Sequence, residues 1–354
     1  MKELRLENFR CYADQSILFR DGINLLIGDN ASGKTTVLKA CRYVLSSFFS
    51  GFGDENTKWL NLDVDDFRQT IVNGTKLPEQ PIKIHFRYDS EMYHVLQRNN
   101  KSNSRVLISG IAEYKEYAGL LFESFFDSEL LAQVLPLPLF AYFSTADIHT
   151  SRKIDARKFV KYAQKSSFGY FECLNGNGFL PYWQKRQIAL LGDKKDREEI
   201  EIVHHAIMKA LGEEGCNIIH DIQIRPKQKK IYYILIDGRE VEAEELPDAY
   251  KRLINIVTDV AFRCALLNRG IYGPSSCTLT CGTVLIDEID LHLHPSLQAL
   301  ILKALKNTFP KIQFIVTTHA PMVTTGVETN EENVVYKLDY SQSEGYCVEL
   351  RIEN

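Results

Sequence analysis

The chain has 354 residues, of which 45% are hydrophobic and 25% charged, and its formal net charge is −4. This length allows one large or two modest domains with a real core, and the composition is ordinary for a globular protein. The slightly negative balance excludes a protein that binds nucleic acid through its total charge, although it leaves room for a local basic face.

The first residues, MKELRLENFRCY, alternate charged and apolar side chains and do not resemble a signal peptide. No run of about 18 apolar residues occurs, so we expect no membrane span. The eight cysteines are scattered, and the close pair Cys277 and Cys281 lacks the second pair that four zinc ligands need. We therefore expect a cytoplasmic protein with reduced thiols.

Strand patterns open the chain. KELRLENF alternates leucines with charges, SILF follows, and INLLIG is a continuous apolar run typical of a buried strand. After residues 28–36, apolar side chains recur every three or four positions up to Phe49, which predicts an amphipathic helix. Residues 81–108 return to period two and predict antiparallel hairpins, and residues 137–145 predict another strand.

The rest of the chain changes character twice. A lysine-rich part predicts helices over 151–165 and 194–214, and a hairpin over 217–241. Helices and apolar strands then alternate, with helices expected over 250–268 and 295–307, strands over 283–290 and 312–320, and two short terminal strands. This alternation predicts a largely parallel, helix-covered sheet in an α/β domain that the lysine-rich part interrupts.

The stretch GDNASGKTT at 28–36 fits the pattern G-x-x-x-x-G-K-[ST]. In this pattern Gly28 and Gly33 let the backbone wrap phosphates, while backbone N–H groups and the helix N-terminus supply partial positive charge. Lys34 would neutralise the β and γ phosphates, and Thr35 would bind Mg²⁺. The alternative is a glycine turn that only caps a helix, which the apolar strand before the loop disfavours.

Two later strands end in polar residues. In TVLIDEID, Asp287 would contribute to the Mg²⁺ coordination shell and Glu288 would orient and deprotonate the attacking water. In FIVTTHAP, a neutral His319 could donate to the γ phosphate. His292 and His294 in DLHLHP are better explained by a turn than by a metal site, because no third ligand is near in sequence.

Four motifs in this order, LENFRCY, IGDNASGKTT, VLIDEIDLHLHP and IVTTHAP, resemble the ABC-type ATPases of the RecF, SMC and OLD grouping. The similarity is greatest to short-armed bacterial members from anti-phage defence, of the Septu PtuA type. It implies a P-loop ABC-type head with an antiparallel β subdomain and an inserted, mainly helical lobe. Residues 1–145 would form the first ATPase lobe, 146–245 the inserted lobe with a hairpin, and 246–354 the signature helix and the remainder of the core.

The resemblance also implies that ATP and Mg²⁺ lie between two subunits arranged head to tail. The residues that would contact the nucleotide are Gly28, Asp29, Asn30, Ala31, Ser32, Gly33, Lys34, Thr35 and Thr36. Asp287 and Glu288 would be the metal and base pair, Asp290 the loop that crosses the dimer, and His319 the γ-phosphate sensor. Arg10 matches an arginine that often reaches the nucleotide, with a solvated strand edge as the equal alternative.

The chain departs from the family pattern at two places. The signature loop is Leu246-Pro247-Asp248-Ala249-Tyr250, in which proline offers neither a hydroxyl nor an N–H to the partner's γ phosphate and alanine replaces a close-packing glycine. The metal-sensing glutamine is missing from AYFSTADIH, where Ser144 or Thr145 would have to replace it. Both departures predict slow turnover with nucleotide binding intact.

These features favour a dimeric ATPase switch in anti-phage defence that controls a separate effector, such as a nuclease, since the chain carries no nuclease motif. The alternative is a RecF-like DNA maintenance ATPase that clamps DNA. Its support comes from two basic runs, Lys153, Arg157, Lys158, Lys161 and Lys165, and Lys227, Lys229 and Lys230. A transporter subunit fits poorly, because the signature is degenerate and the N-terminal strand belongs to the RecF side.

Overall fold

The computed structural model describes residues 1–54, 56–88, 91–100, 106–126, 135–145, 166–176, 180–190, 197–225, 227–341 and 345–351. It divides into two compact units. Unit 1 comprises Met1–Leu135, Gln313–His319 and Glu328–Asn354, and unit 2 comprises Pro136–Ile312 and Ala320–Val327. The expected boundaries after residue 145 and before residue 246 stay a prediction. The helix expected over 151–165 lies outside the described residues.

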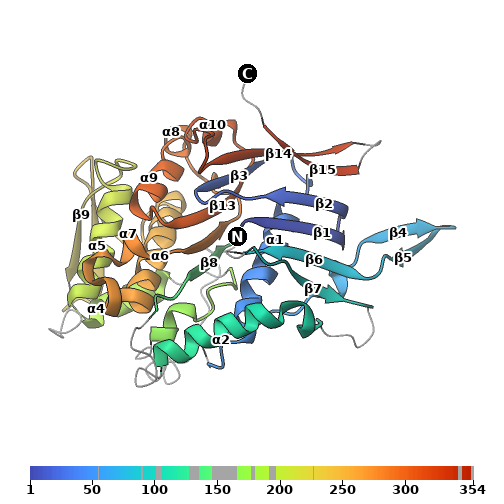
Figure 1. Ribbon diagram of the computed structural model, residues 1–354. Helices are drawn as coiled ribbons and strands as arrows, with labels where there is room; N and C mark the ends of the chain where they lie inside the picture. The colour runs from blue at the N-terminus through green and yellow to red at the C-terminus, as the bar shows by residue number, and fades with distance from the viewer. Residues whose placement is uncertain are drawn as a thin grey trace. The chain divides into compact units, whose positions relative to one another are not determined.

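The first sheet of unit 1 is antiparallel, with strand order β2-β1-β6-β7 (Figure 1). Its strands are β1 (Glu3–Phe9), β2 (Tyr12–Leu18), β6 (Ile82–Arg87) and β7 (His94–Arg98). Buried and half-exposed side chains alternate along β6 and β7, which confirms the period-two pattern. One face of this sheet therefore packs on the core of the unit.

The second sheet of unit 1 is built around β3 (Ile23–Ile27). Strands β13 (Ile312–Thr318) and β14 (Val334–Ser341) pair with β3 in parallel, and β15 (Gly345–Leu350) pairs with β14 in antiparallel. Every residue of β13 is buried, as expected for a parallel strand covered on both faces.

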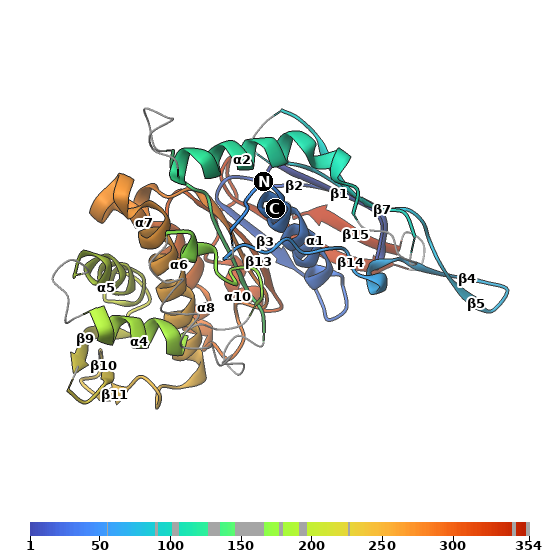
Figure 2. The same ribbon diagram turned by 90° about the horizontal axis from the view of Figure 1, so that it is seen from below.

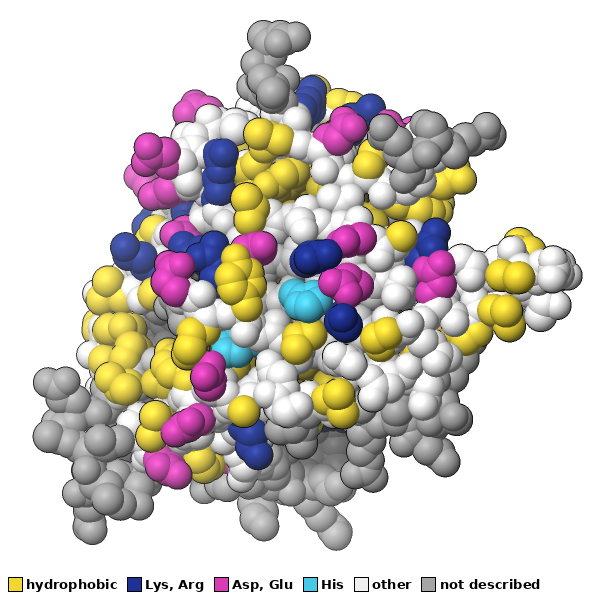
Figure 3. Space-filling model, turned by 45° about the vertical axis from the view of Figure 1, so that its right-hand side comes forward, with side chains coloured by type: hydrophobic (Ala, Val, Ile, Leu, Met, Phe, Trp, Pro, Cys, Tyr) yellow, Lys and Arg dark blue, Asp and Glu magenta, His cyan; other side chains and the backbone are white. Residues whose placement is uncertain are grey.

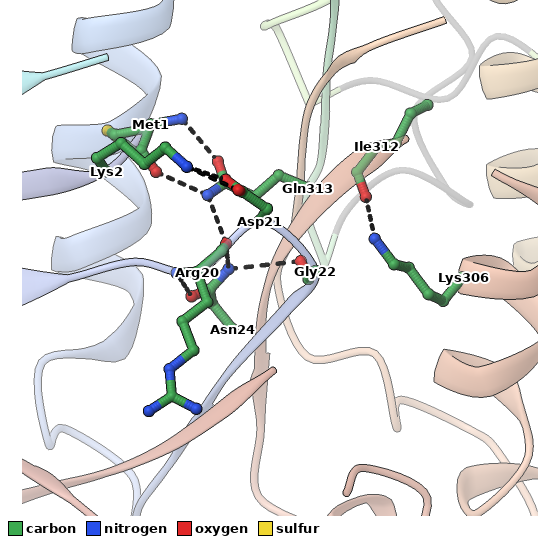
Figure 4. A network of polar contacts seen from close by, with 9 residues as sticks. All are labelled: Met1, Lys2, Arg20, Asp21, Gly22, Asn24, Lys306, Ile312 and Gln313. Carbon is green, nitrogen blue, oxygen red and sulfur yellow. Dashed lines mark hydrogen bonds and ion pairs between the residues drawn. The ribbon is translucent and has the colours of Figure 1, made fainter. Parts of the chain in front are cut away.

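Polar contacts join the chain start to this sheet (Figure 4). The Met1 amine donates to Gln313 Oε1 at 2.9 Å, and Gln313 Nε2 donates to the main-chain oxygens of Met1 and Arg20 at 2.7 Å each. Segments about 300 residues apart in sequence are thus held side by side by buried hydrogen bonds.

The helices of unit 1 are α1 (Lys34–Ser47) and α2 (Ala112–Phe126), with short 3₁₀ turns at η1 (Phe48–Ser50), η2 (Val64–Asp66) and η3 (Ile108–Ile111). Helix α1 is the one predicted after the glycine loop. The pattern did not predict α2, whose Tyr114 packs edge-on against Phe48 and Phe86. Tertiary aromatic contacts rather than a clean apolar stripe place this helix.

A hairpin of β4 (Gln69–Val72) and β5 (Thr75–Pro78) projects from unit 1 (Figures 1 and 2). Figure 3 shows hydrophobic side chains on it, and the exposed ones are Ile71, Val72 and Leu77. The sequence pattern did not predict this hairpin, because its two strands are short and neither has a face of buried side chains.

Unit 2 contains the parallel pair β8 (Leu139–Phe143) and β12 (Gly282–Ile286). A three-stranded antiparallel sheet, β9 (Ile219–Arg225), β10 (Lys230–Leu235) and β11 (Glu240–Glu242), lies beside α4 (Figure 2). Its helices and 3₁₀ turns are η4 (Ser166–Tyr170), α4 (Leu180–Leu190), α5 (Arg197–Leu211), α6 (Asp248–Tyr272), η5 (Gly273–Ser275), α7 (Ser276–Leu279), α8 (Pro295–Gln298), α9 (Ile301–Thr308) and α10 (Pro321–Thr324). The helix expected over 295–307 is therefore two helices.

Helix α6 is the centre of unit 2 and buries 16 of its 25 residues. Asp259 accepts hydrogen bonds from Trp183 Nε1 at 2.7 Å and from Arg263 Nε at 2.6 Å, and the Trp183 ring stacks on Phe262. The buried charge of Asp259 is thereby matched. None of the described helices, α6 included, combines the length and apolarity that crossing a bilayer requires.

Candidate functional site

The glycine loop connects the end of β3 to the start of α1. Ala31 and Gly33 both adopt left-handed backbone conformations, with φ of 65° and 96°, so the chain curls before the helix begins. Asp29, Asn30 and Thr35 are exposed, whereas Ser32 is buried. Helix α1 therefore begins directly after a curled, accessible loop, which is the geometry that binds phosphate.

Both glycines of the motif are required by space. A Cβ at Gly28 would lie 2.3 Å from the Leu338 oxygen, and a Cβ at Gly33 would lie 2.5 Å from Tyr12 Oη. The first residue of β2 and strand β14, both in unit 1, thus lie against the loop. The sequence predicted the glycines but not these neighbours.

Lys34 lies at the centre of the loop with its side chain buried. Its ammonium donates to the main-chain oxygens of Gly28 at 2.8 Å and Asp29 at 2.7 Å. These bonds curl the side chain back over the loop, where it can neutralise a bound phosphate.

His319 reaches the same place from the neighbouring strand. Strands β3 and β13 pair in parallel with Thr318 opposite Ile27, so the residues that follow each strand emerge at one edge. The His319 Nδ1 atom lies 3.4 Å from Lys34 Nζ. The structure therefore brings the predicted sensor to the predicted phosphate loop.

Arg10 occupies the turn between β1 and β2, with φ of 53°. Its Nη1 lies 3.7 Å from Oδ1 of the buried Asp66, which also accepts hydrogen bonds from Lys39 Nζ and Tyr43 Oη of α1, both at 2.6 Å. Burial and the bond to Asp66 raise the pKa of the Tyr43 hydroxyl. Arg10 is thus paired with Asp66 while its side chain stays 40% exposed.

Asp66, which contacts Lys39, Tyr43 and Arg10, is a buried acid that the sequence analysis did not identify. The available signal was the acidic cluster LDVDDF at 62–67, in which Asp63 caps η2 and Asp66 turns inward. A pattern cannot distinguish the inward carboxylate from its solvated neighbours.

The predicted acids lie in unit 2, on the turn that follows β12. Asp287 is buried, and its N–H continues the pairing with β8 by donating to the Phe143 oxygen at 2.8 Å. Glu288 has a left-handed φ of 49°, and Leu291 N donates to its oxygen. Asp290 follows in the next tight turn, where its oxygen accepts from Leu293 N. Asp287, Glu288 and Asp290 therefore belong to one compact turn.

The signature loop lies directly at the start of α6. Leu246 is buried, Pro247 caps the helix in an extended conformation, and its oxygen accepts the hydrogen bond of Lys251 N. Asp248 is exposed and Ala249 half-exposed, so the helix N-terminus faces outward. Ser144, one candidate for the missing glutamine, donates its hydroxyl to the Gly176 oxygen at 2.6 Å.

The donors present fit the nucleotide and metal that the sequence predicts. The curled loop and the Lys34 ammonium suit phosphate oxygens, and its two glycine positions leave no room for a side chain. The Thr35 hydroxyl and the Asp287 carboxylate are the oxygen ligands that Mg²⁺ prefers. His294, in contrast, caps α8 by accepting from Ser296 N.

Comparison with known proteins gives consistent results. The family described as "AAA domain, putative AbiEii toxin, Type IV TA system" matches residues 23–323. The "Retron Vc95 probable ATPase" of Vibrio cholerae is 28% identical over 89% of this chain and 69% of its own length. The "Septu protein PtuA" of Bacillus thuringiensis is 22% identical over 94% of this chain and 74% of its own.

A solved structure supports the fold. The crystal structure of an Smc head bound to the C-winged helix domain of ScpA matches 99% of this chain and 97% of that chain, with a TM-score of 0.53 and 14% sequence identity. The predicted fold class, a P-loop ABC-type head with an antiparallel β subdomain, is confirmed. The chain belongs to the AAA domain family that matches residues 23–323, and it is an ATPase whose fold is that of an ABC-type head.

Proposed function

We propose that this ATPase is a slow, nucleotide-controlled dimeric switch that regulates a separate effector in bacterial anti-phage defence. The observation that carries the proposal is the start of α6, where Pro247 and Ala249 replace a hydroxyl donor and a glycine while the phosphate loop keeps all of its elements. Loss of one preorganised donor typically lowers a rate by about 10² to 10³. ATP binding thus depends on the phosphate loop, and turnover depends also on the start of α6. Only the start of α6 is weakened.

Each residue has a proposed role in the reaction. Lys34 and the loop N–H groups bind the phosphates, and His319 donates to the terminal one. Glu288 orients the attacking water and accepts its proton. Bound Mg²⁺ would neutralise charge that develops on the phosphates, with Thr35 and Asp287 contributing ligands. Pro247, Asp248, Ala249 and Asp290 would meet the nucleotide of a second subunit, and Arg10 would reach its own.

The defence role rests on two kinds of support. The relatives include one named as a retron ATPase and one named as a Septu protein, and the motifs resemble anti-phage members of the grouping. A nuclease is the proposed effector, and the cytoplasm, where ATP and reduced thiols occur, is the proposed location.

DNA clamping is the second candidate, and the described part of its second basic run supports it only in part, because Lys227 and Lys229 are exposed whereas Lys230 pairs with an acid. Lys230 is neutralised by Glu242, with 2.5 Å between Lys230 Nζ and Glu242 Oε2. On the neighbouring strand, Arg225 pairs with Glu240 at 2.7 Å. The basic run from Lys153 to Lys165 lies outside the described residues.

Gly33→Ala tests the phosphate loop. We expect the ATP affinity to fall at least tenfold, about 1.4 kcal/mol, because the added methyl meets Tyr12. Gly74→Ala is the matched control, since Gly74 also has a left-handed φ of 76° but a Cβ there meets nothing within 4 Å. Titration calorimetry with Mg-ATP measures both, and Lys34→Ala should give no binding heat. Equal affinities of the two alanine variants would contradict the assignment.

Glu288→Gln tests the base. Because general bases typically contribute about 10² to 10⁴ to a rate, we expect turnover to fall at least about 100-fold with ATP affinity retained. Mass photometry should show the dimer accumulating with ATP. Glu244→Gln, an exposed glutamate, is the control and should behave as the wild type. Unchanged turnover in Glu288→Gln shows that another group is the base.

Restoring the signature tests the slow switch. We expect wild-type turnover well below about 10 s⁻¹, the middle of the usual range for enzymes. The double variant Pro247→Ser, Ala249→Gly should raise it at least about tenfold, because it returns one donor and removes one methyl. Phosphate release measures both rates. A fast wild type, or a double variant no faster than it, rules out the signature as the brake.

Copurification tests the effector. The tagged protein, expressed from its native gene neighbourhood, should elute as a complex with a second protein, and native mass spectrometry should give the stoichiometry. Lys34→Ala should change the amount of partner retained, because the proposed switch is set by nucleotide. A chain that always elutes without a second protein refutes regulation of a separate effector.

A further inference from the structure

Arg252 lies in the second turn of α6, two residues after the signature loop, and its side chain is fully buried. Its Nη2 donates to the main-chain oxygen of Asp287 at 2.5 Å. A charged donor makes this hydrogen bond stronger than a neutral one. The start of the signature helix is thereby bonded to the turn that carries Glu288.

This bond acts on the peptide that sets the direction of Glu288. The Asp287 N–H, in the peptide before Asp287, is fixed by the Phe143 oxygen, and the Asp287 oxygen, in the peptide that leads to Glu288, is fixed by Arg252. The backbone is therefore held on both sides of the Asp287 Cα atom. Glu288 has a φ of 49°, a conformation that is strained for a non-glycine residue and persists only where its surroundings impose it. Arg252 supplies one of these constraints.

The charge of Arg252 is not explained by packing. Its Nε and Nη1 atoms are buried and have no hydrogen-bond partner among the residues that the structure describes. Arg263 on the same helix is different, because Asp259 neutralises it at 2.6 Å. A buried, weakly compensated cation destabilises a fold, and a neutral side chain of equal length would fill the space without that cost. What Arg252 gains is its bond to Asp287.

We propose that Arg252 is a positioning residue for ATP hydrolysis, which holds the Asp287 oxygen and thereby aims the Glu288 carboxylate. It also links the two elements physically, so that a displacement of the first turns of α6 would turn Glu288 away from the water. The inference rests on the proposed role of Glu288 as the base.

The test compares Arg252→Met and Arg252→Lys with the wild type. Arg252→Met keeps length and removes every donor, so kcat should fall at least about tenfold while KM for ATP changes less than about twofold, since a misaimed group costs rate rather than binding. Arg252→Lys keeps a charged donor group on a single nitrogen and should recover part of the loss. Unchanged kcat in both variants, or a loss confined to KM, overturns the proposal.

A double-mutant cycle separates positioning from structural damage. In the Glu288→Gln background, Arg252→Met should lower the residual single-turnover rate by less than about twofold, because the group that it positions is already gone. A full tenfold loss in that background overturns the proposal. If Arg252→Met does not fold, the same cycle is run with Arg252→Lys. This variant should lower the single-turnover rate about threefold in the wild-type background and should not lower it in the Glu288→Gln background.

Arg269→Met is the matched control on the same helix. Arg269 bonds Glu199 at 3.3 Å, and Arg186 still pairs with Glu199 at 2.5 Å when Arg269 is removed, so kcat should stay within about twofold. The two hypotheses fail differently. Wild-type turnover in Glu288→Gln refutes the base itself, whereas a crippled Glu288→Gln beside a fully active Arg252→Met refutes only the positioning role.

Discussion

Parallel pairing of β3 with β13 is the constraint on which the phosphate site depends. The register places Thr318 opposite Ile27, so the loop after one strand and the histidine after the other emerge at the same edge. Lys34 then lies between loop carbonyls and the His319 ring. A shift by one residue would move His319 away and reverse which side chains of the strand face inward. Buried polar contacts at the chain start, through Gln313, hold the opposite end of β13.

Two buried charged side chains differ in how well their charges are compensated. Asp66 accepts hydrogen bonds from Lys39 and Tyr43 and attracts Arg10, so the carboxylate is well compensated and orders the basic side chains along α1. Arg252 has one described bond, to a carbonyl. The first arrangement stabilises the unit and the second costs stability. Such an uneven distribution is expected where a rigid scaffold carries one strained, functional turn.

Nucleotide binding and signature contact lie on separate elements, which lets one weaken without the other. The loop before α1 depends on two glycines that no side chain could replace without a clash. The formation of α6 requires only that the residues before it allow a helix to begin, and Pro247 is fully compatible with helix initiation. The fold therefore tolerates a poor signature, and in the proposed switch the loss falls on turnover rather than on stability.

The sequence alone determined the elements whose signals are local: the glycine loop, α1, the buried strands, the acids after β12 and the degenerate signature. It failed at α2 and at the β4–β5 hairpin, whose places depend on aromatic contacts and on projection from the unit rather than on periodicity. Only the tertiary structure decided that Asp66 turns inward under Arg10, that Tyr12 presses on Gly33, and that Arg252 holds Asp287. Local pattern fixes which residues share a face of a strand or helix, whereas contacts between segments 20 to 300 residues apart arise from packing, which no short window of sequence contains.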